Sequence, residues 1–302
     1  MSPVISQLRE RVWGICVHWT TQTTPRRGNP LAYPDAVDRF DVEQFADTLA
    51  KTGAGYLVFT PTHAWHWPPA PIAASEKILP GRSCGRDLIG EIANAVRARG
   101  MLFLLYYNHS CNNEDDPDWQ KAAGWQEADK SGFEWKIQSV LREMGMRYGE
   151  RVSGYWIDSA FTIYPHNPDW AEWTDALKTG YSERVICYNS GINNLHAYTP
   201  LQDYWAGEFD TLGFPLAQPA LNAGNGLPFH SLFWLDDYWL HHEMDKPIAL
   251  PIYSDRRLLA YVRDVRDAGA FTTLNLGIYQ DGTFSPETLD QVRLISQDLK
   301  NG

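Results

Sequence analysis

The sequence predicts an α/β protein, a single (β/α)8 barrel of the TIM type that spans residues 1–302. Three observations lead to this expectation. Eight short apolar runs have the length of strands, segments with helical periodicity lie between most of them, and glycine directly follows several of those segments. Strands that alternate with helices form parallel sheets through right-handed crossovers, and about 250 residues is a typical length for eight such units.

The expected elements follow one another along the whole chain. The strands are Val12–His18, Tyr56–Thr60, Leu102–Tyr107, Gly154–Asp158, Arg184–Asn189, Tyr204–Glu208, Ser231–Leu235 and Thr272–Leu276. The helices are Val42–Lys51, Asp87–Arg99, Glu134–Tyr148, Trp170–Thr179, Asp255–Ala268 and Pro286–Leu299. A doubly wound open sheet is the alternative, but no GxGxxG motif follows the first strand, so the barrel is preferred.

Polar and aromatic residues gather at the carboxyl ends of these strands, where enzymes of this fold carry their active sites. The strand-end residues are His18, His63, Tyr107, Asp158, Asn189, Glu208, Trp234 and Asn275. Long loops rich in Pro and Gly, residues 20–40, 61–85 and 209–230, follow the first, second and sixth strands. Long loops on one rim commonly build a substrate pocket.

Two acidic residues, Asp158 and Glu208, are expected to point toward this rim from different strands. Paired carboxyl groups are the machinery of glycosidases. A separation of about 5 to 5.5 Å accompanies retention through a covalent intermediate, whereas about 6.5 to 9.5 Å leaves room for a water molecule and inverts the sugar. An Asp after a strand can equally be a helix N-cap or a salt-bridge partner, so spacing alone does not decide.

The composition excludes several classes of protein. A net charge of -11 without a long basic run argues against a nucleic-acid partner or an anionic membrane. The longest apolar run, Met101 to Tyr107, is far shorter than the roughly 20 residues of a membrane span. The first residues resemble no signal peptide, so a cytoplasmic location is expected. Thirteen Trp, 15 Tyr and 12 Phe, many beside His, Asp and Asn, suit a sugar whose C–H faces stack on rings.

Six motifs occur in a fixed order along the chain. They are WGICVHW (13–19), FADTLAKTGAGYLVFTPTH (45–63), GRDLIGEIANAVRARGMLFLLYY (85–107), GYWID (154–158), DYWAGEF (203–209) and GAFTTLNLGIYQDGTFSPE (269–287). In this order they resemble the motifs of glycoside hydrolase family 29, the α-L-fucosidases. The resemblance runs from about Trp13 to Leu299 and so covers nearly the whole chain.

The resemblance implies a retaining exo-glycosidase that cleaves a terminal α-L-linked sugar, in the first place an α-L-fucoside, by double displacement. It implies no metal and no other cofactor, and a small-molecule or oligosaccharide substrate. Asp158 corresponds to the nucleophile and Glu208 to the acid/base. The residues expected to bind the sugar are His18, Trp19, His63, Trp65, Tyr107, Asn189 and Trp234.

The chain departs from the family pattern at two positions. Ala64 stands where the family has the second His of a pair, and Gly191 where an Arg follows the fifth strand. Each lost charge-assisted hydrogen bond is worth about 1.5 to 3 kcal/mol, so a sugar of galactose, arabinose or glucose type stays open as the substrate. We expect a form without the β-sandwich that many members append, in which the long loops or a neighbouring subunit in a homo-oligomer take its place.

Three further alternatives stay open at this point. Asp236 or Asp237, after the seventh expected strand, could supply the acid/base if Glu208 points away. The histidines near the rim could instead bind a metal, although the first strand lacks an HxH motif. A carbohydrate-binding pseudoenzyme is the third, although both predicted catalytic carboxyl groups are present in the chain.

Overall fold

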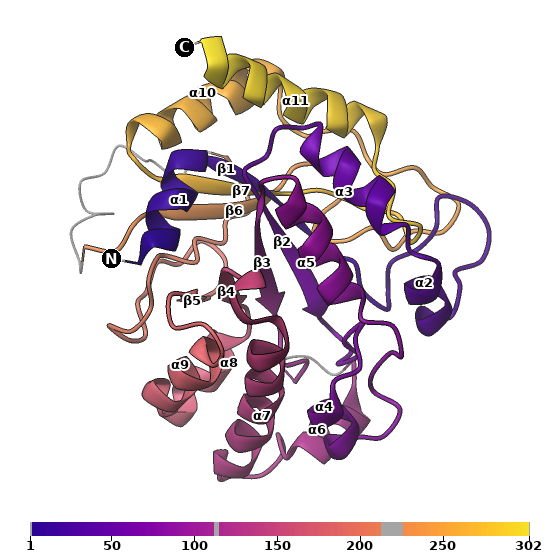
Figure 1. Ribbon diagram of the computed structural model, residues 1–302, viewed down its shortest axis with the longest axis vertical. Helices are drawn as coiled ribbons and strands as arrows, with labels where there is room; N and C mark the ends of the chain where they lie inside the picture. The colour runs from indigo at the N-terminus through magenta and orange to yellow at the C-terminus, as the bar shows by residue number, and fades with distance from the viewer. Residues whose placement is uncertain (1, 112–114, 213–225, 302) are drawn as a thin grey trace.

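The computed structural model describes residues 2–111, 115–212 and 226–301. Its centre is a sheet of seven strands: β1 (Trp13–Val17), β2 (Tyr56–Thr62), β3 (Leu102–Tyr107), β4 (Gly154–Ile157), β5 (Val185–Tyr188), β6 (His230–Trp234) and β7 (Phe271–Asn275). They lie in the order β5-β4-β3-β2-β1-β7-β6, and every neighbouring pair is parallel. Figure 1 shows β1, β6 and β7 turned away from the direction of β2 and β3, so the sheet is curled.

Helices surround the convex side of the sheet (Figure 1). They are α1 (Pro3–Arg11), α2 (Tyr33–Arg39), α3 (Val42–Ala50), α4 (Ala73–Ile78), α5 (Leu88–Ala98), α6 (Pro117–Ala123), α7 (Ser131–Tyr148), α8 (Ala160–Ile163), α9 (Trp170–Lys178), α10 (Asp255–Asp267) and α11 (Pro286–Asn301). All six expected helices are confirmed with small shifts of their ends. The side chains of Asp41, Asp87 and Asp169 accept hydrogen bonds from first-turn N–H groups, so each caps the helix that follows it.

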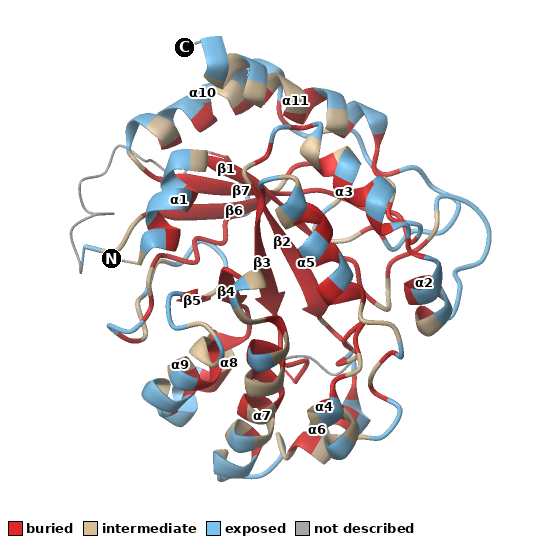
Figure 2. Ribbon diagram, in the orientation of Figure 1, coloured by how far each residue is buried: buried red, intermediate tan, exposed pale blue. Residues whose placement is uncertain are grey.

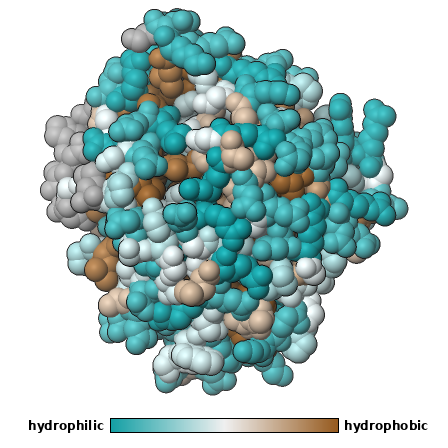
Figure 3. Space-filling view, in the orientation of Figure 1, coloured by the Kyte–Doolittle hydropathy of each residue, from teal (hydrophilic) through white to brown (hydrophobic). Residues whose placement is uncertain are grey.

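Buried side chains form two clusters, one on each face of the sheet. The inner cluster consists of Val4, Ile5, Leu8, Cys16, Tyr56, Val58, Leu102, Leu104, Tyr106, Trp156, Val185, Cys187, Tyr204, Ala206, Leu232 and Phe271. Because α1 contributes three of these side chains and leads directly into β1, it covers the amino-terminal end of the sheet. The outer cluster packs the other face against the helices, whose solvent side is exposed in Figure 2 and mainly hydrophilic in Figure 3.

The expected strand Tyr204–Glu208 was wrong, since only an isolated bridge joins Glu208 to Leu232 there. Gly207 has a φ of +60°, which breaks the extended conformation, and it lies so close to His230 that a Cβ would meet the carbonyl oxygen at 1.9 Å. The segment still lies between β5 and β6, because the N–H of Asp203 donates to the oxygen of Ile186. The described residues therefore form a seven-stranded curled sheet, and a closed eight-stranded barrel is not confirmed.

None of the helices in the three described segments combines the length and the apolar character that a membrane span requires.

Candidate active site

Three polar side chains converge where the inner face of the sheet meets the rim. Successive side chains of a strand point to opposite faces, so a residue two positions beyond an inner side chain also points inward. Asp158, Asn189 and Glu208 each stand two residues after a member of the inner cluster, namely Trp156, Cys187 and Ala206. β4 and β5 thus deliver Asp158 and Asn189, and an isolated bridge to Leu232 of β6 holds Glu208 at the same edge.

The side chain of Asn189 joins the two carboxyl groups. Its Nδ2 donates to Oδ1 of Asp158 at 3.0 Å and to Oε2 of Glu208 at 2.6 Å. Its Oδ1 accepts from the N–H of Gly191 at 3.0 Å, which identifies the nitrogen end of the amide. The two carboxyl oxygens are therefore no further apart than these two hydrogen bonds laid end to end, about 5.6 Å.

The two carboxyl groups differ in their surroundings. Asp158 also accepts a hydrogen bond at 2.6 Å from Nδ2 of Asn108, a residue that sequence reasoning missed, so amide donors hold both of its oxygens. Glu208 has a single amide donor and is 8% exposed. Burial, reinforced by the negative charge of Asp158, raises the pKa of Glu208 to about 8, against the opposing effect of Asn189. Glu208 is thus protonated at neutral pH.

Two histidines border the carboxyl groups with unpartnered ring nitrogens. Asn275 donates through Nδ2 to two backbone carbonyls, so its Oδ1 accepts from Nδ1–H of His18 at 2.7 Å. This assigns the tautomer of His18 and leaves Nε2 as an acceptor with no partner among the described residues. Burial lowers the pKa of His18 to about 3, so the ring is neutral. The ring of His63 lies 5.4 Å away, and its Nδ1 also lacks a described partner.

The structure does not bring Tyr107 into this group. Its ring lies on the outer face of the sheet, in the outer cluster. The preceding residue, Tyr106, points inward instead, where its ring stacks on Trp156 at 4.7 Å and lies 4.6 Å from His18. Burial and the charges of Asp158 and Glu208 raise the pKa of Tyr106. The alternation through Leu102 and Leu104 could have identified Tyr106, because a step of one residue reverses the face.

The same one-residue step places Trp19 outside the site, because it follows the inward-pointing His18 and therefore points to the outer face. The indole of Trp19 is fully buried in the outer cluster, 5.3 Å from the ring of Tyr33 and 4.9 Å from that of Phe40. Its Nε1 donates to the backbone oxygen of Gln280 at 3.0 Å. Trp19 therefore anchors the loop after β1 and has no free face for a sugar.

The other two predicted tryptophans lie at the rim. Trp65 is 40% exposed, and the guanidinium of Arg82 lies 5.2 Å from its ring centre. Trp234 ends β6, and its ring lies 5.1 Å from that of Trp239, which in turn is 5.7 Å from His18. Trp239, another residue that the sequence did not indicate, thus links Trp234 to the histidines.

The two departures from the family pattern have different surroundings. Ala64 is buried beside His63. Gly191 has a φ of +95°, a conformation that strains any residue with a Cβ, although open space surrounds the position. Its backbone N–H orients Asn189, so an uncharged amide lies between the two carboxyl groups.

Asp236 and Asp237, the alternative acids, are engaged in holding loops. Asp236 accepts hydrogen bonds from the N–H of Gly277 and the hydroxyl of Thr288, both at 2.7 Å. Asp237 accepts from the N–H of Ala249 at 2.8 Å and from the ring of His241. These partners belong to the loops that follow β6 and β7 and, for Thr288, to the first turn of α11, and they favour a structural role for both acids.

The rim histidines do not assemble into a metal site. His66 stacks on Trp119 at 3.7 Å and bonds Ser75 through Nε2, while Nε2 of His109 bonds Thr162. Within the described ranges, no three His, Cys, Asp or Glu side chains come together as metal ligands would.

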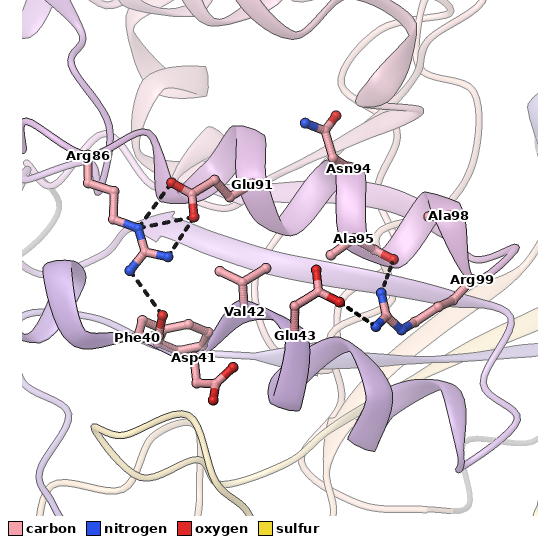
Figure 4. Close-up of a pocket in the computed structure, with 10 residues that line it drawn as sticks. All are labelled: Phe40, Asp41, Val42, Glu43, Arg86, Glu91, Asn94, Ala95, Ala98 and Arg99. Carbon is pink, nitrogen blue, oxygen red and sulfur yellow. Dashed lines mark hydrogen bonds and ion pairs between the residues drawn. The ribbon is translucent and has the colours of Figure 1, made fainter.

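A separate cavity of about 630 Å³ lies on the outer surface between α3 and α5 (Figure 4). Its charged groups are already paired, Arg86 with Glu91 and Arg99 with Glu43. Because it lies in the helical layer and faces solvent, it is distinct from the carboxyl site.

Comparisons with known proteins identify the family of the chain. The family model described as alpha-L-fucosidase matches residues 30–301. No curated protein sequence gives a significant match.

Solved structures share the fold at low sequence identity. An alpha-L-fucosidase from Bacteroides thetaiotaomicron, trapped as a covalent intermediate, aligns over 99% of this chain and 75% of its own, with a TM-score of 0.69 and 14% identity. An alpha-L-fucosidase from Lactobacillus casei with bound alpha-L-fucose aligns over 99% and 98%, with a TM-score of 0.68 and 16% identity. An endo-fucoidan hydrolase of glycoside hydrolase family 107 aligns over 98% and 93%, with a TM-score of 0.71 and 16% identity. By the match of the family model over most of its length, the chain belongs to the α-L-fucosidase family and is a glycoside hydrolase.

Proposed function

We propose that the protein is a retaining exo-α-L-fucosidase with Asp158 as nucleophile and Glu208 as acid/base. The observation that carries the proposal is the amide of Asn189, which donates to both carboxyl groups. The resulting upper limit of about 5.6 Å between the bonded oxygens agrees with the short separation of retaining glycosidases and is too small for the inverting arrangement.

The protonation state of Glu208 supports this division of roles. An Oδ atom of Asp158 attacks the anomeric carbon while Glu208, with a pKa raised to about 8, gives its proton to the glycosidic oxygen. The leaving group departs as an alcohol, and the sugar is held as an ester of Asp158. The ionised Glu208 then takes a proton from water, whose oxygen attacks the same carbon and releases Asp158 and a sugar of retained configuration.

The substrate reaches the carboxyl groups from the rim, because the inner cluster fills the sheet below them. The exo mode of attack is part of the proposal and is taken from the resemblance of the chain to the family. The unprotonated Nε2 of His18 accepts a hydrogen bond from a sugar hydroxyl, and the neighbouring His63 supplies a second ring nitrogen. A buried polar atom without a partner is costly, and a bound hydroxyl removes that cost.

The bridge between the two carboxyl groups carries no charge. A guanidinium between the carboxyl groups would favour their charged forms and lower the pKa of Glu208. The uncharged amide of Asn189 keeps the two groups together and leaves the proton on Glu208. The acid form needed for the first step is therefore retained without a cation at Gly191.

The test is a panel of aryl α-L-glycosides (fucoside, galactoside, arabinoside, glucoside and rhamnoside) with Asp158→Asn as control. Hydrolysis of the fucoside that disappears in Asp158→Asn is the expected result, and proton NMR should show the α-anomer as the first product. Incubation with 2-fluoro-fucosyl fluoride should add one fluorofucosyl mass to the peptide that contains Asp158. Hydrolysis of a different sugar would reassign the substrate, and β-anomer as first product would disprove retention.

A further inference from the structure

An aromatic stack lies on the segments that follow β4 and β5 and has no part in the reaction described above. The rings of Tyr164 and Tyr198 stack at 4.3 Å with an interplanar angle of 25°, and Tyr198 stacks in turn on Trp170 at 5.7 Å and 2°. Trp170 packs against Tyr188 of β5 at 4.6 Å, so the stack is anchored to the sheet. We call Tyr164, Tyr198 and Trp170, together with the adjoining His196, the rim shelf.

Tyr164 is the accessible end of the rim shelf. It is 45% exposed although Tyr198 covers one side of its ring. The ring of His196 meets it edge-on at 5.6 Å. A ring held from behind with a free outer face is a preorganised platform, because little side-chain freedom remains to be lost when a ligand stacks on it.

The segments that carry the rim shelf are joined to both catalytic residues. Helix α8 begins two residues after Asp158 and leads directly to Tyr164, so the chain between them reaches at most about 20 Å. The loop that carries His196 and Tyr198 is joined to the acid/base, since the N–H of Asn193 donates to the backbone oxygen of Glu208 at 2.8 Å. Figure 1 shows α8 and α9 beside the ends of β4 and β5.

We propose that the rim shelf binds the leaving-group sugars of a neutral oligosaccharide, with Tyr164 stacked on a pyranose face. The acid/base protonates the leaving oxygen, so the side of the site next to Glu208 is where the leaving group must lie. This inference rests on the proposed function and adds the substrate class, a fucosylated neutral glycan in place of a small glycoside.

The charges near the rim shelf favour a neutral ligand over a sulfated one. Asp169 and Glu172 flank Trp170 on exposed positions, and the shelf itself contains no Lys or Arg. The net charge of the chain, -11, opposes the approach of a polyanion. The imidazole of His196 and the amide of Asn193 are the groups available for sugar hydroxyls.

The experiment compares two substrates that share the fucosyl group. 2′-Fucosyllactose places two neutral sugars on the leaving side, whereas α-L-fucosyl fluoride places none. Tyr164→Ala should lower kcat/KM for the trisaccharide about tenfold relative to that for the fluoride, through a raised KM. Tyr164→Phe should retain the preference, because the ring and not the hydroxyl makes the contact. Trp135→Ala, at an exposed position of α7, is the matched control and should leave both values unchanged.

A second measurement separates this inference from the proposed function. The dissociation constant of lactose alone, measured by titration calorimetry, should rise in Tyr164→Ala even if no fucoside is hydrolysed. If no fucoside is hydrolysed but Tyr164→Ala weakens lactose binding, the fucosidase assignment is overturned and the binding role of the rim shelf is supported. Equal losses on both substrates, or an unchanged lactose affinity, would overturn the rim shelf while leaving the assignment intact.

Discussion

Two pairs of acids lie at the rim of the same sheet, and their hydrogen-bond partners differ in kind. Asp158 and Glu208 share one amide donor, Asn189. Asp236 and Asp237 instead hold donors from other segments, among them the hydroxyl of Thr288 in α11 and the N–H of Ala249. In the first pair the groups face each other across a single side chain, whereas in the second each acid fixes a separate segment of backbone.

The difference teaches that burial alone does not identify a catalytic acid. Burial raises the pKa of Glu208 to about 8 and that of Asp236 to about 6, so both are perturbed in the same direction. For Asp236, hydrogen bonds from Gly277 and Thr288 oppose the shift and use both oxygens. Glu208 has one described donor and faces a second carboxyl group, which leaves it able to exchange a proton with a substrate.

The largest expected effect is on turnover in Asp158→Asn. Removal of the nucleophile should lower kcat by about 10⁴-fold or more, because no covalent intermediate can form. Added azide should restore part of the activity and yield a fucosyl azide. The corresponding change in the other pair, Asp237→Asn, is the control, and a similar loss of kcat there would erase the distinction between the pairs. The measurement is steady-state hydrolysis of an aryl α-L-fucoside.

The second prediction concerns the dependence on the leaving group in Glu208→Gln. Without an acid the departing oxygen receives no proton, so hydrolysis of an alkyl fucoside should fall by about 10² to 10⁴-fold. kcat/KM for α-L-fucosyl fluoride should fall far less, because fluoride leaves without protonation and kcat/KM reports only the step that forms the ester of Asp158. Equal losses on the two substrates, measured under the same conditions, would contradict the acid/base role of Glu208 and reopen the case for Asp236.

The third prediction moves from turnover to stability. Asp236→Ala leaves the N–H of Gly277 and the hydroxyl of Thr288 buried without an acceptor, which should lower the free energy of unfolding by about 2 to 4 kcal/mol. Urea unfolding at pH 7 measures this change. Asp236→Asn keeps one acceptor oxygen, so its free energy of unfolding should lie between those of the unaltered protein and Asp236→Ala. A native-like stability of the Ala variant would show that these bonds do not hold the loop.

Glu208→Gln should raise the free energy of unfolding near neutral pH, whereas Asp236→Ala lowers it. The pKa of Glu208 is about 8 in the folded protein against an ordinary value of 4.5, so the folded state retains a proton that the unfolded state loses between these values. Stability should therefore fall as pH rises from about 5 to about 8. Glu208→Gln removes the titrating group and should flatten that slope, which unfolding curves at several pH values would reveal.

Local patterns along the chain account for most of the fold. Helical periodicity and glycine stops located all six expected helices, because both signals depend on neighbouring residues alone. The expected strand Tyr204–Glu208 does not form because Gly207 has a positive φ. At this position the backbone approaches His230 of the neighbouring strand closely. Such a contact between segments cannot be inferred from local composition.

The candidate site was predictable only as far as the alternation of side chains along a strand assigns each residue to one face of the sheet. Asp158, Asn189 and Glu208 come together as their strand-end positions indicated. Tyr107 and Trp19 lie one residue out of phase, and the inner face had to be known before that phase could be assigned. The hydrogen bonds that engage the carboxylate of Asp236 were not predictable, because their donors lie 41 and 52 residues further along the chain.

The smallest expected effect is a shift of a pH profile, and it tests the bridge that distinguishes the first pair. kcat/KM should fall as pH rises through about 8, since Glu208 then loses the proton that the leaving group needs. The hydrogen bond from Asn189 lowers the pKa of Glu208, so Asn189→Ala should move this basic limb to higher pH while lowering kcat. Asn108→Ala is the matched control, because Asn108 donates to Asp158 alone of the two acids and should leave the limb in place. A limb that moves equally in both variants, or in neither, would mean that Asn189 does not couple the carboxyl groups.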